Sequence, residues 1–188
     1  MSWRSYVSLT KPRVVVLLQI TALCAVLVHD RMYKQLGIET AETMLIVFVG
    51  GYLSAGGANA INMWYDRDID PLMTRTESRA IPSGEVSAES ALALGVLLSI
   101  AGVSWFWMLS NEVAAFWSAF SILFYVFVYS IWLKRSTPQN IVIGGIAGST
   151  PPVIGWAAAE DGLTVVTDSA QIMLESLIDL GSPMPWFM

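Results

Sequence analysis

Charged residues are scarce in this sequence. Asp, Glu, Lys and Arg make up 13% of its 188 residues, whereas soluble domains contain about 25%. Hydrophobic residues make up 55%, so the composition excludes an ordinary soluble domain and predicts an integral membrane protein in contact with the lipid bilayer. The net charge of -5 gives no basic surface, and we expect no nucleic-acid partner.

Cysteine and histidine each occur only once. Because Cys24 has no second thiol in the chain, no internal disulfide can form, and the redox compartment stays open. His29 follows the first apolar stretch. A single histidine there is more typical of a surface residue than of a haem or metal ligand, and we expect it to be exposed.

Five long stretches lack any charged residue. They cover residues 14–28, 43–65, 90–111, 113–133 and 136–159. Most of them reach the length of about 20 residues that a helix needs to cross a bilayer. The first is short, but the side chains of Lys11 and Arg13 can extend to the membrane interface and lengthen it. The sequence therefore predicts an all-α fold, a polytopic membrane helical bundle of about five transmembrane helices.

Lysine and arginine are distributed unequally between the two sides of this bundle. Eight of the ten lie before the first predicted helix, between the second and third, or between the fourth and fifth. Only Arg31 and Lys34 fall on the other side. The positive-inside rule then predicts that the N-terminus and the loop after the second helix are cytoplasmic.

The most informative motif is Asn62, Asp66 and Asp70, spaced four residues apart at the end of the second stretch. On a continuous helix this spacing places three oxygen-bearing side chains on one face over about 12 Å. Carboxylates near a helix C-terminus oppose the macrodipole, so a cation should offset them. Mg²⁺ with a diphosphate suits best, because Mg²⁺ prefers one or two carboxylates plus phosphate oxygens. Asp68 lies off this face and should pair with a loop arginine.

Two interpretations stay open for the residues around this motif. Small residues at 50–60 could form a helix-packing face or a substrate-facing one, and both could hold together. The cytoplasmic loops could be merely solvated, or their basic side chains could neutralise phosphate. The residues concerned are Arg75, Arg79, Lys134 and Arg135.

Five segments, taken in order, resemble one family. They are LTKPR at 9–13, NMWYDRDID at 62–70, RTESRAIPSGEVS at 75–87, LKRSTPQNIVIGG at 133–145 and PPVIGWAA at 151–158. Together they resemble the UbiA-type membrane prenyltransferases, most closely the branch that farnesylates haem b (protohaem IX). The resemblance covers residues 8 to about 158. It implies a membrane prenyltransferase domain at 1–159, the N-terminal half of the UbiA-type fold, in the prokaryotic cell (inner) membrane.

The resemblance implies a transferase that moves a farnesyl group from farnesyl diphosphate to a vinyl group of haem b, giving haem O. This is a step of haem O and haem A biosynthesis for terminal oxidases, so a haem A synthase or oxidase assembly proteins are the implied partners. Mg²⁺ would be held by Asp66 and Asp70, with Asn62 completing the catalytic set. Contacts to the diphosphate or the haem propionates are implied for Arg13, Arg75, Arg79, Lys134 and Arg135, besides Asn62.

Two departures from the family pattern stand out. Ala80 replaces a proline that this branch usually has. The family folds into about nine helices and has a second aspartate motif, whereas five helices are predicted here and no such motif follows. Residues 160–188 contain no lysine or arginine, and we interpret them as a divergent acidic tail with a short amphipathic helix after Asp168. A truncated or frameshifted gene would give this pattern.

Two other functions remain open at this point. A UbiA-type enzyme could prenylate a quinone or a chlorophyll precursor instead of haem. Alternatively, the chain could be an inactive, truncated membrane remnant, since half of a diphosphate site should bind weakly.

Overall fold

The computed structural model describes residues 3–160, and every regular element within that range is a helix. The main helices are α1 (Trp3–Leu9), α2 (Pro12–Tyr33), α3 (Ile38–Tyr65), α4 (Ala88–Leu109), α5 (Glu112–Leu123) and α6 (Asn140–Ala159). Two short 3₁₀ turns, η1 (Asp66–Asp68) and η2 (Asp70–Leu72), follow α3, and the π-helix η3 (Phe124–Leu133) continues α5. The all-α prediction is confirmed.

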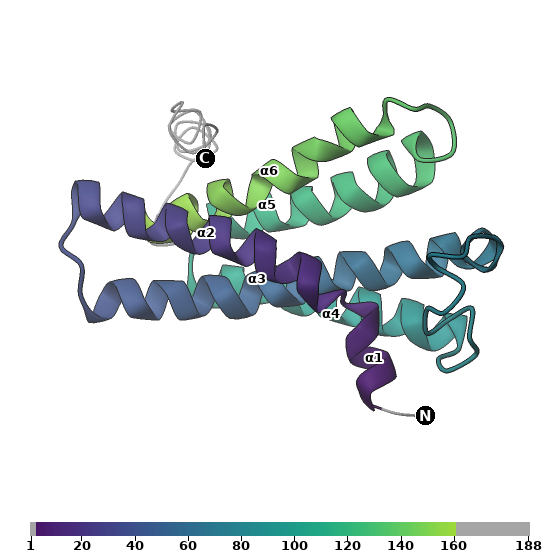
Figure 1. Ribbon diagram of the computed structural model, residues 1–188. Coiled ribbons are helices and arrows are strands. Elements are labelled where there is room, and N and C mark those ends of the chain that lie inside the picture. Colours follow the sequence, from purple (N-terminus) through teal and green to yellow (C-terminus); the bar gives the residue numbers. More distant parts are fainter. Residues whose placement is uncertain (1–2, 161–188) are drawn as a thin grey trace.

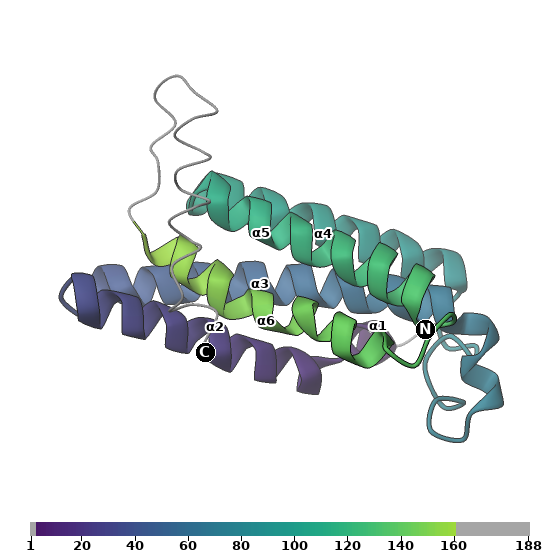
Figure 2. The same ribbon diagram turned by 90° about the horizontal axis from the view of Figure 1, so that it is seen from above.

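Five membrane-length spans form the bundle, as predicted. They are α2, α3, α4, α5 joined to η3, and α6, each long and apolar enough to cross a bilayer. Toward the end that carries the aspartate motif, α5 and α6 diverge from α3 and α4 (Figure 1). Seen from above, α6 lies between α2 and α5 (Figure 2). The bundle is therefore closed at one end and more open at the end that carries the aspartate motif.

The junction between α1 and α2 is a sharp turn at Lys11. Its φ of 50° is the left-handed conformation, which no other non-glycine residue between 3 and 160 adopts. Pro12 then opens α2 at a position where its missing N–H is not needed. Leu9 is fully buried against the rest of the bundle. The turn leaves α1 at an angle to α2 (Figure 1) and directs the Lys11 side chain toward α3.

Glycines bring α3 and α4 into close contact. A Cβ atom on Gly57 would lie 2.8 Å from the carbonyl oxygen of Gly95, and one on Gly102 would lie 2.8 Å from the backbone nitrogen of Ser54. Real Cβ atoms do not come so close to backbone, so this contact requires glycine. The same stretch of α3 also lines a cavity on its other side through Ser54 and Ala58. The helix-packing interpretation of these small residues is therefore confirmed, and the substrate-facing one stays a prediction.

The closed end of the bundle buries His29, contrary to the prediction that this residue is exposed. Only 3% of His29 is exposed. Its Nδ1 lies 3.1 Å from Oδ1 of Asp30, and its ring packs edge-on against Trp156 with 5.0 Å between centroids. The prediction failed because α6, more than 100 residues further along the chain, covers this part of α2.

Side chains tie the helix ends together at this closed end. The side-chain nitrogen of Asn111 donates a hydrogen bond to the carbonyl of Ala157 (2.7 Å), while its oxygen caps α5 by accepting from the backbone of Ala114 (2.8 Å). Nζ of Lys34 donates to the carbonyl of Ala159 (2.7 Å). These bonds fix α2, α5 and α6 relative to one another.

The predicted acidic tail with its short amphipathic helix lies outside the described residues. The division of the chain at residue 159 therefore stays a prediction.

Candidate functional site

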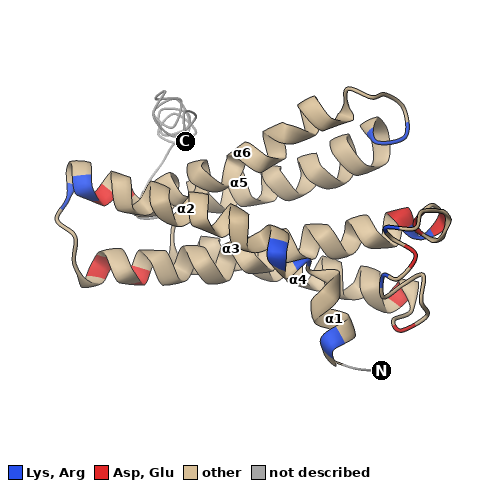
Figure 3. Ribbon diagram, in the orientation of Figure 1, with Lys and Arg blue, Asp and Glu red and all other residues tan. Residues whose placement is uncertain are grey.

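Charged side chains gather at the two ends of the bundle and are sparse between them (Figure 3). The aspartate motif lies at the open end, but it does not form the continuous helical ladder that was predicted. The α-helix ends at Tyr65, and Asp66 and Asp70 each begin a separate 3₁₀ turn. Pro71 explains the break, because it provides no backbone N–H and disfavours helical geometry at Asp70.

All three motif side chains are nevertheless buried. Asn62 is 2% exposed, Asp66 is 0% and Asp70 is 1%. Burying an unpaired carboxylate is strongly unfavourable, so each needs a cation or hydrogen-bond donors. The structure supplies these cations from the same chain, one from the loop nine residues after Asp70 and one 68 residues after Asp66.

Lys134, at the end of η3, forms an ion pair with Oδ2 of Asp66. The other carboxylate oxygen of Asp66, Oδ1, is buried and has no hydrogen-bond partner among residues 3–160. Of the two carboxylate oxygens of Asp66, only Oδ2 has a partner, although both can accept hydrogen bonds. Asp66 is therefore the point in the cluster with an acceptor left for a ligand.

Arg79 holds Asp70. Its Nη1 donates to both carboxylate oxygens of Asp70 at 2.8 Å. The loop between η2 and α4 is folded back to allow this, with the Thr76 hydroxyl donating to the Asp70 carbonyl at 2.9 Å and Ala80 and Val86 buried beneath it. The loop is thus an ordered part of the site.

Asn62 links three helices through its amide. Nζ of Lys11 donates to its oxygen (3.0 Å), and its nitrogen donates to the Ser130 hydroxyl (3.0 Å). Burial, and after it the nearby Arg79 and Lys134, lower the pKa of Lys11 to about 8, against the opposing effect of Asp66 and Asp70. Sequence reasoning did not select Lys11 as a site residue. The sequence signal that could have identified Lys11 is its position directly before Pro12, because the turn at this position directs the Lys11 side chain into the bundle.

Asp68 and Arg135 form an outer ion pair, with distances of 2.7 and 2.8 Å. The pairing of Asp68 with a loop arginine is confirmed. The Arg135 guanidinium also lies 4.4 Å from the centre of the Tyr65 ring. Arg13 and Arg75 are exposed and are not part of the buried cluster, so their substrate contacts stay predictions.

The π-helix η3 places side chains both in the cluster and in the cavity beside it. π-helical segments are rare and often occur at functional sites. The backbone N–H of Lys134 bonds to the carbonyl of Tyr129, five residues earlier (2.9 Å). The rings of Tyr125 and Tyr129 stack with 5.2 Å between centroids, and both line the cavity. Sequence periodicity did not predict this wider helix.

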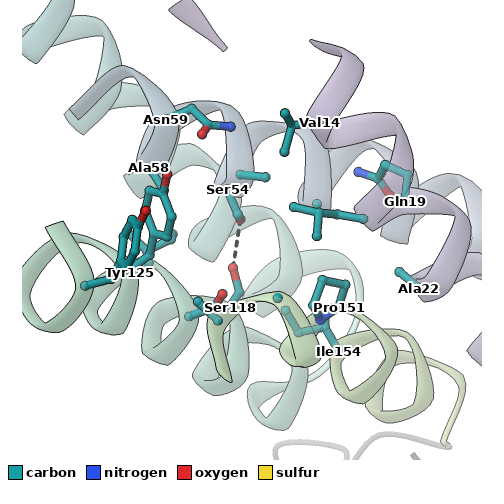
Figure 4. Close-up of a pocket in the computed structure, with 18 of the residues that line it drawn as sticks. Val14, Gln19, Ala22, Ser54, Ala58, Asn59, Ser118, Tyr125, Pro151 and Ile154 are labelled. Atoms are coloured by element: carbon teal, nitrogen blue, oxygen red, sulfur yellow. Dashed lines mark hydrogen bonds between the residues drawn. The ribbon is translucent and has the colours of Figure 1, made fainter. Parts of the chain in front are cut away.

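An apolar cavity of about 370 Å³ lies between α2, α3, α5, η3 and α6. This volume is within the range of small-molecule sites. Figure 4 shows its walls, with Asn59 on α3 near Tyr125 and a hydrogen bond of 2.8 Å between Ser54 and Ser118 crossing its middle. The lining includes Asn59, one helical turn before Asn62 on α3, but none of the charged residues of the cluster.

The cluster fits a divalent cation only if a ligand supplies further oxygens. No group of three or more His, Cys, Asp or Glu side chains suited to a metal exists in residues 3–160. Two buried carboxylates, one with the unpaired Oδ1 of Asp66, match the one or two carboxylates that Mg²⁺ takes when phosphates complete its shell.

Comparison with protein families gives the class of the protein. The model of the UbiA prenyltransferase family matches residues 15–188, and the chain belongs to this family. Its fold is therefore that of a membrane prenyltransferase family, whose members generally use a divalent metal to bind diphosphate. The match continues past residue 158, where the motifs described above end.

Individual relatives narrow the resemblance to the haem branch. The chain is 47% identical over 163 residues to a protoheme IX farnesyltransferase of Gluconacetobacter diazotrophicus, covering 87% of this chain and 50% of that protein. The same name is given to similar proteins of Bartonella henselae (50% over 158 residues, 82% and 47% covered) and Symbiobacterium thermophilum (46% over 181 residues, 96% and 57% covered). The chain thus spans about half the length of these relatives. No solved structure matches it.

Proposed function

We propose that the protein transfers a farnesyl group from farnesyl diphosphate to a vinyl group of haem b and so forms haem O. The observation that carries this proposal is the pair of buried aspartates, Asp66 and Asp70, each held by a cation, in a bundle whose apolar cavity extends along α3 as far as Asn59. A diphosphate needs a charged site such as this cluster, and the isoprenoid chain attached to it needs an apolar cavity nearby. The names of the relatives support farnesyl as the chain and haem as the acceptor, and none of those names suggests a quinone or chlorophyll precursor.

Asp66 and Asp70 would hold Mg²⁺, with Asn62 beside them. When bound with the diphosphate, the ion would withdraw charge from the phosphate oxygens and so stabilise the leaving group. The unpaired Oδ1 of Asp66 is the acceptor that such an ion needs.

The basic residues of the cluster would bind the diphosphate. Lys134 and Arg79 now neutralise the two aspartates. With a metal on those carboxylates, Lys134 and Arg79 would no longer be needed to neutralise them. The two side chains would then donate hydrogen bonds to phosphate oxygens, to which guanidinium and ammonium groups bind strongly. Lys11, 3.0 Å from Asn62, adds a third donor. The two ion pairs would thus offset the charges of Asp66 and Asp70 before a metal diphosphate binds and become phosphate contacts once it is bound.

The cavity would hold the farnesyl chain and keep water from the reaction. The bond between C1 and the diphosphate oxygen breaks, the diphosphate leaves with the bonding electron pair, and the vinyl carbon of haem b forms a new bond to C1. Water then adds to the neighbouring carbon and loses a proton, which gives the hydroxyl of haem O. The stacked faces of Tyr125 and Tyr129 would stabilise positive charge that develops on the chain, and the apolar walls delay the water.

We also propose that the N-terminus and the aspartate cluster face the cytoplasm across the prokaryotic inner membrane. Eight of the ten lysines and arginines lie on that side, as the positive-inside rule requires. A haem A synthase or oxidase assembly proteins, acting on haem O, are the proposed partners.

Mass spectrometry of the product tests this function. The 188-residue chain in lipid nanodiscs is supplied with farnesyl diphosphate, haem b and Mg²⁺, and the haem fraction is searched for the mass of one added farnesyl group and one hydroxyl group. Asp66→Asn should lower product formation by roughly 10²–10³-fold, as expected when a main source of electrostatic stabilisation is lost. The matched control is Asp68→Asn in the exposed outer pair, which should retain activity. Equal product from the Asp66→Asn variant and the unchanged chain would refute the proposal.

A further inference from the structure

Asn59 is a polar side chain in the lining of the apolar cavity, and only 6% of it is exposed. Its Nδ2 donates a hydrogen bond to the carbonyl of Thr10 (3.1 Å), which fixes the amide against the turn between α1 and α2. The other side of the amide carries Oδ1, which accepts no hydrogen bond among residues 3–160 and is not fully enclosed by them. The amide of Asn59 therefore presents an acceptor to the cavity.

Asn59 lies on the same face of α3 as Asp66. Seven residues separate the two, which is close to two helical turns and about 10 Å along the helix. The backbone N–H of Asp66 still bonds to the carbonyl of Asn62, so this helical relation holds as far as Asp66. A metal ion about 2 Å from the carboxylate of Asp66, and the phosphate that joins it to C1 of the farnesyl chain, fit within this length. The vinyl carbons of haem b lie within two bonds of C1 once it has reacted, and thus near Asn59.

The hydroxyl of Tyr125 is a second polar group at this end of the cavity. Tyr125 also lines the cavity, and its hydroxyl forms no hydrogen bond among residues 3–160 and is not fully enclosed by them. The Tyr125 ring and the Asn59 amide lie at the same end of the cavity, away from Gln19 and Ala22 (Figure 4). A buried water is held when it has two to four polar partners, and these two groups provide an acceptor and a donor.

Polar side chains deeper in the cavity are already paired or enclosed. The hydroxyls of Ser54 and Ser118 bond to each other (2.8 Å), and Ser121 accepts a hydrogen bond from Thr150 (2.8 Å). The unpaired oxygen of Gln19 is fully buried and so is not open to the cavity. Asn59 and Tyr125 therefore differ from these groups in having polar atoms that can still bind a small molecule.

We propose that Asn59 and Tyr125 position the water molecule that completes the reaction. This proposal rests on the proposed function, because the water is needed only after C1 has bonded to the vinyl group and left a cation on the neighbouring carbon. Oδ1 of Asn59 accepts one hydrogen of the water, and the Tyr125 hydroxyl donates to one of its lone pairs. The second lone pair forms the bond to the cationic carbon. The proton that the water then loses goes to an oxygen of the departed diphosphate.

Without a positioned water, the same cation loses a proton instead. A C–H bond of the neighbouring CH₂ group breaks, its electron pair forms a carbon–carbon double bond, and the diphosphate takes the proton. The product is a farnesylated haem without the hydroxyl, lighter than haem O by one water. The ratio of this dehydrated product to haem O therefore reports how well the water is held.

Mass spectrometry of the two products tests the proposal. The full chain in nanodiscs is supplied with farnesyl diphosphate, haem b and Mg²⁺, and the dehydrated product is measured relative to haem O. Asn59→Leu, which keeps a similar size and removes the acceptor, should raise this ratio about tenfold, the effect of one lost hydrogen bond. The matched control is Ser118→Ala, which removes a cavity hydroxyl that is already bonded to Ser54 and should leave the ratio unchanged. An unchanged ratio in Asn59→Leu overturns the proposal.

Tyr125→Phe tests the same water from its other partner. It keeps the aromatic ring and leaves the hydrogen bond from Asn59 to Thr10 intact, and it should raise the ratio severalfold. If Asn59→Leu does not fold, an unchanged ratio in Tyr125→Phe overturns the proposal. A purely structural role of either residue would lower both products together and leave their ratio as it was, against the proposal.

The same experiment separates this inference from the proposed function. If the unchanged chain forms neither product, the proposed function fails and this inference with it. Farnesylated haem whose two forms keep the same ratio in every variant would remove only the role of Asn59 and Tyr125.

Discussion

The two ends of the bundle bury charge in different ways. At the closed end, Asp30 pairs with its neighbour His29, and side chains bond directly to the backbone at the end of α6. At the open end, Asp66 and Asp70 are held by long basic side chains, Lys134 and Arg79, each of which comes from a loop or a helix end. Bonds between a side chain and a carbonyl fix helices in place. Ion pairs between flexible side chains can be exchanged for a ligand of the right charge, so the open end is the one suited to binding.

Removing the cation beside Asp66 should have the largest effect on stability. Lys134→Ala leaves a fully buried carboxylate without its partner, and the free energy of unfolding should fall by about 3 kcal/mol. Unfolding in detergent with increasing SDS measures this. Lys134→Arg is the matched control, because it keeps the charge, and it should lose much less. A loss below about 1 kcal/mol, the value of an exposed pair, would show that the two ends do not differ as described.

Crowding the glycine contact between α3 and α4 should have the next largest effect. Gly57→Ala places a Cβ atom 2.8 Å from the carbonyl of Gly95, so the helices must separate, at a cost of about 1–3 kcal/mol. The same unfolding assay applies. Gly145→Ala is the matched control, since a Cβ there meets nothing within 4 Å. It should be neutral or slightly stabilising, because alanine favours helix over glycine. Equal losses in both variants would contradict the close packing.

Raising the pH should weaken diphosphate binding through Lys11. Its pKa of about 8, against an ordinary 10.5, means that the charge is present at pH 7 and mostly lost at pH 9. Affinity for farnesyl diphosphate should therefore fall up to about tenfold over this range. Lys11→Arg stays charged and should remove this part of the dependence; an identical pH profile in that variant would exclude Lys11 as the cause.

Without ligand, the same lowered pKa acts in the opposite direction on folding. Between about pH 8 and 10.5 the unfolded chain binds the Lys11 proton and the folded protein does not, so the contribution of Lys11 to stability rises with pH there.

The outer ion pair should contribute least. Arg135→Ala removes the partner of Asp68, whose side chain is 58% exposed, and should lower the free energy of unfolding by less than about 1 kcal/mol. Added salt should reduce even this difference, because exposed charges are screened. A loss as large as that of Lys134→Ala would mean that burial is not what distinguishes the two pairs.

The helices could be predicted from the sequence because their signal is local. Uncharged stretches of membrane length give the five spans, and the positions of Lys and Arg distinguish the two sides. The end of α3 was predicted too late, since spacing at 62, 66 and 70 is helical, and only Pro71 indicated the break. The burial of His29 depends on α6, which no pattern in α2 could reveal.

The site could be predicted only in part, for a similar reason. The two aspartates and their neighbour Asn62 stand out by spacing, but their partners do not. Lys134 is 68 residues from Asp66 in sequence, and Lys11 is 51 residues from Asn62. Such pairs form only through helix packing. Candidate basic residues could therefore be named from the loops, while the structure selected Arg79 and Lys134 for the buried aspartates and left Arg13 and Arg75 exposed.

The central claim is that the ion pairs of the open end exchange for a metal diphosphate. Calorimetric titration of Mg²⁺ into the full chain, with and without farnesyl diphosphate, tests it most directly. The account predicts clear Mg²⁺ binding only when the diphosphate is present, because Lys134 and Arg79 occupy the carboxylates until phosphate draws them away. The Asp66→Asn variant should lose this binding and Asp68→Asn should keep it. Equal Mg²⁺ affinity with and without the diphosphate, or no binding in either case, would contradict the account.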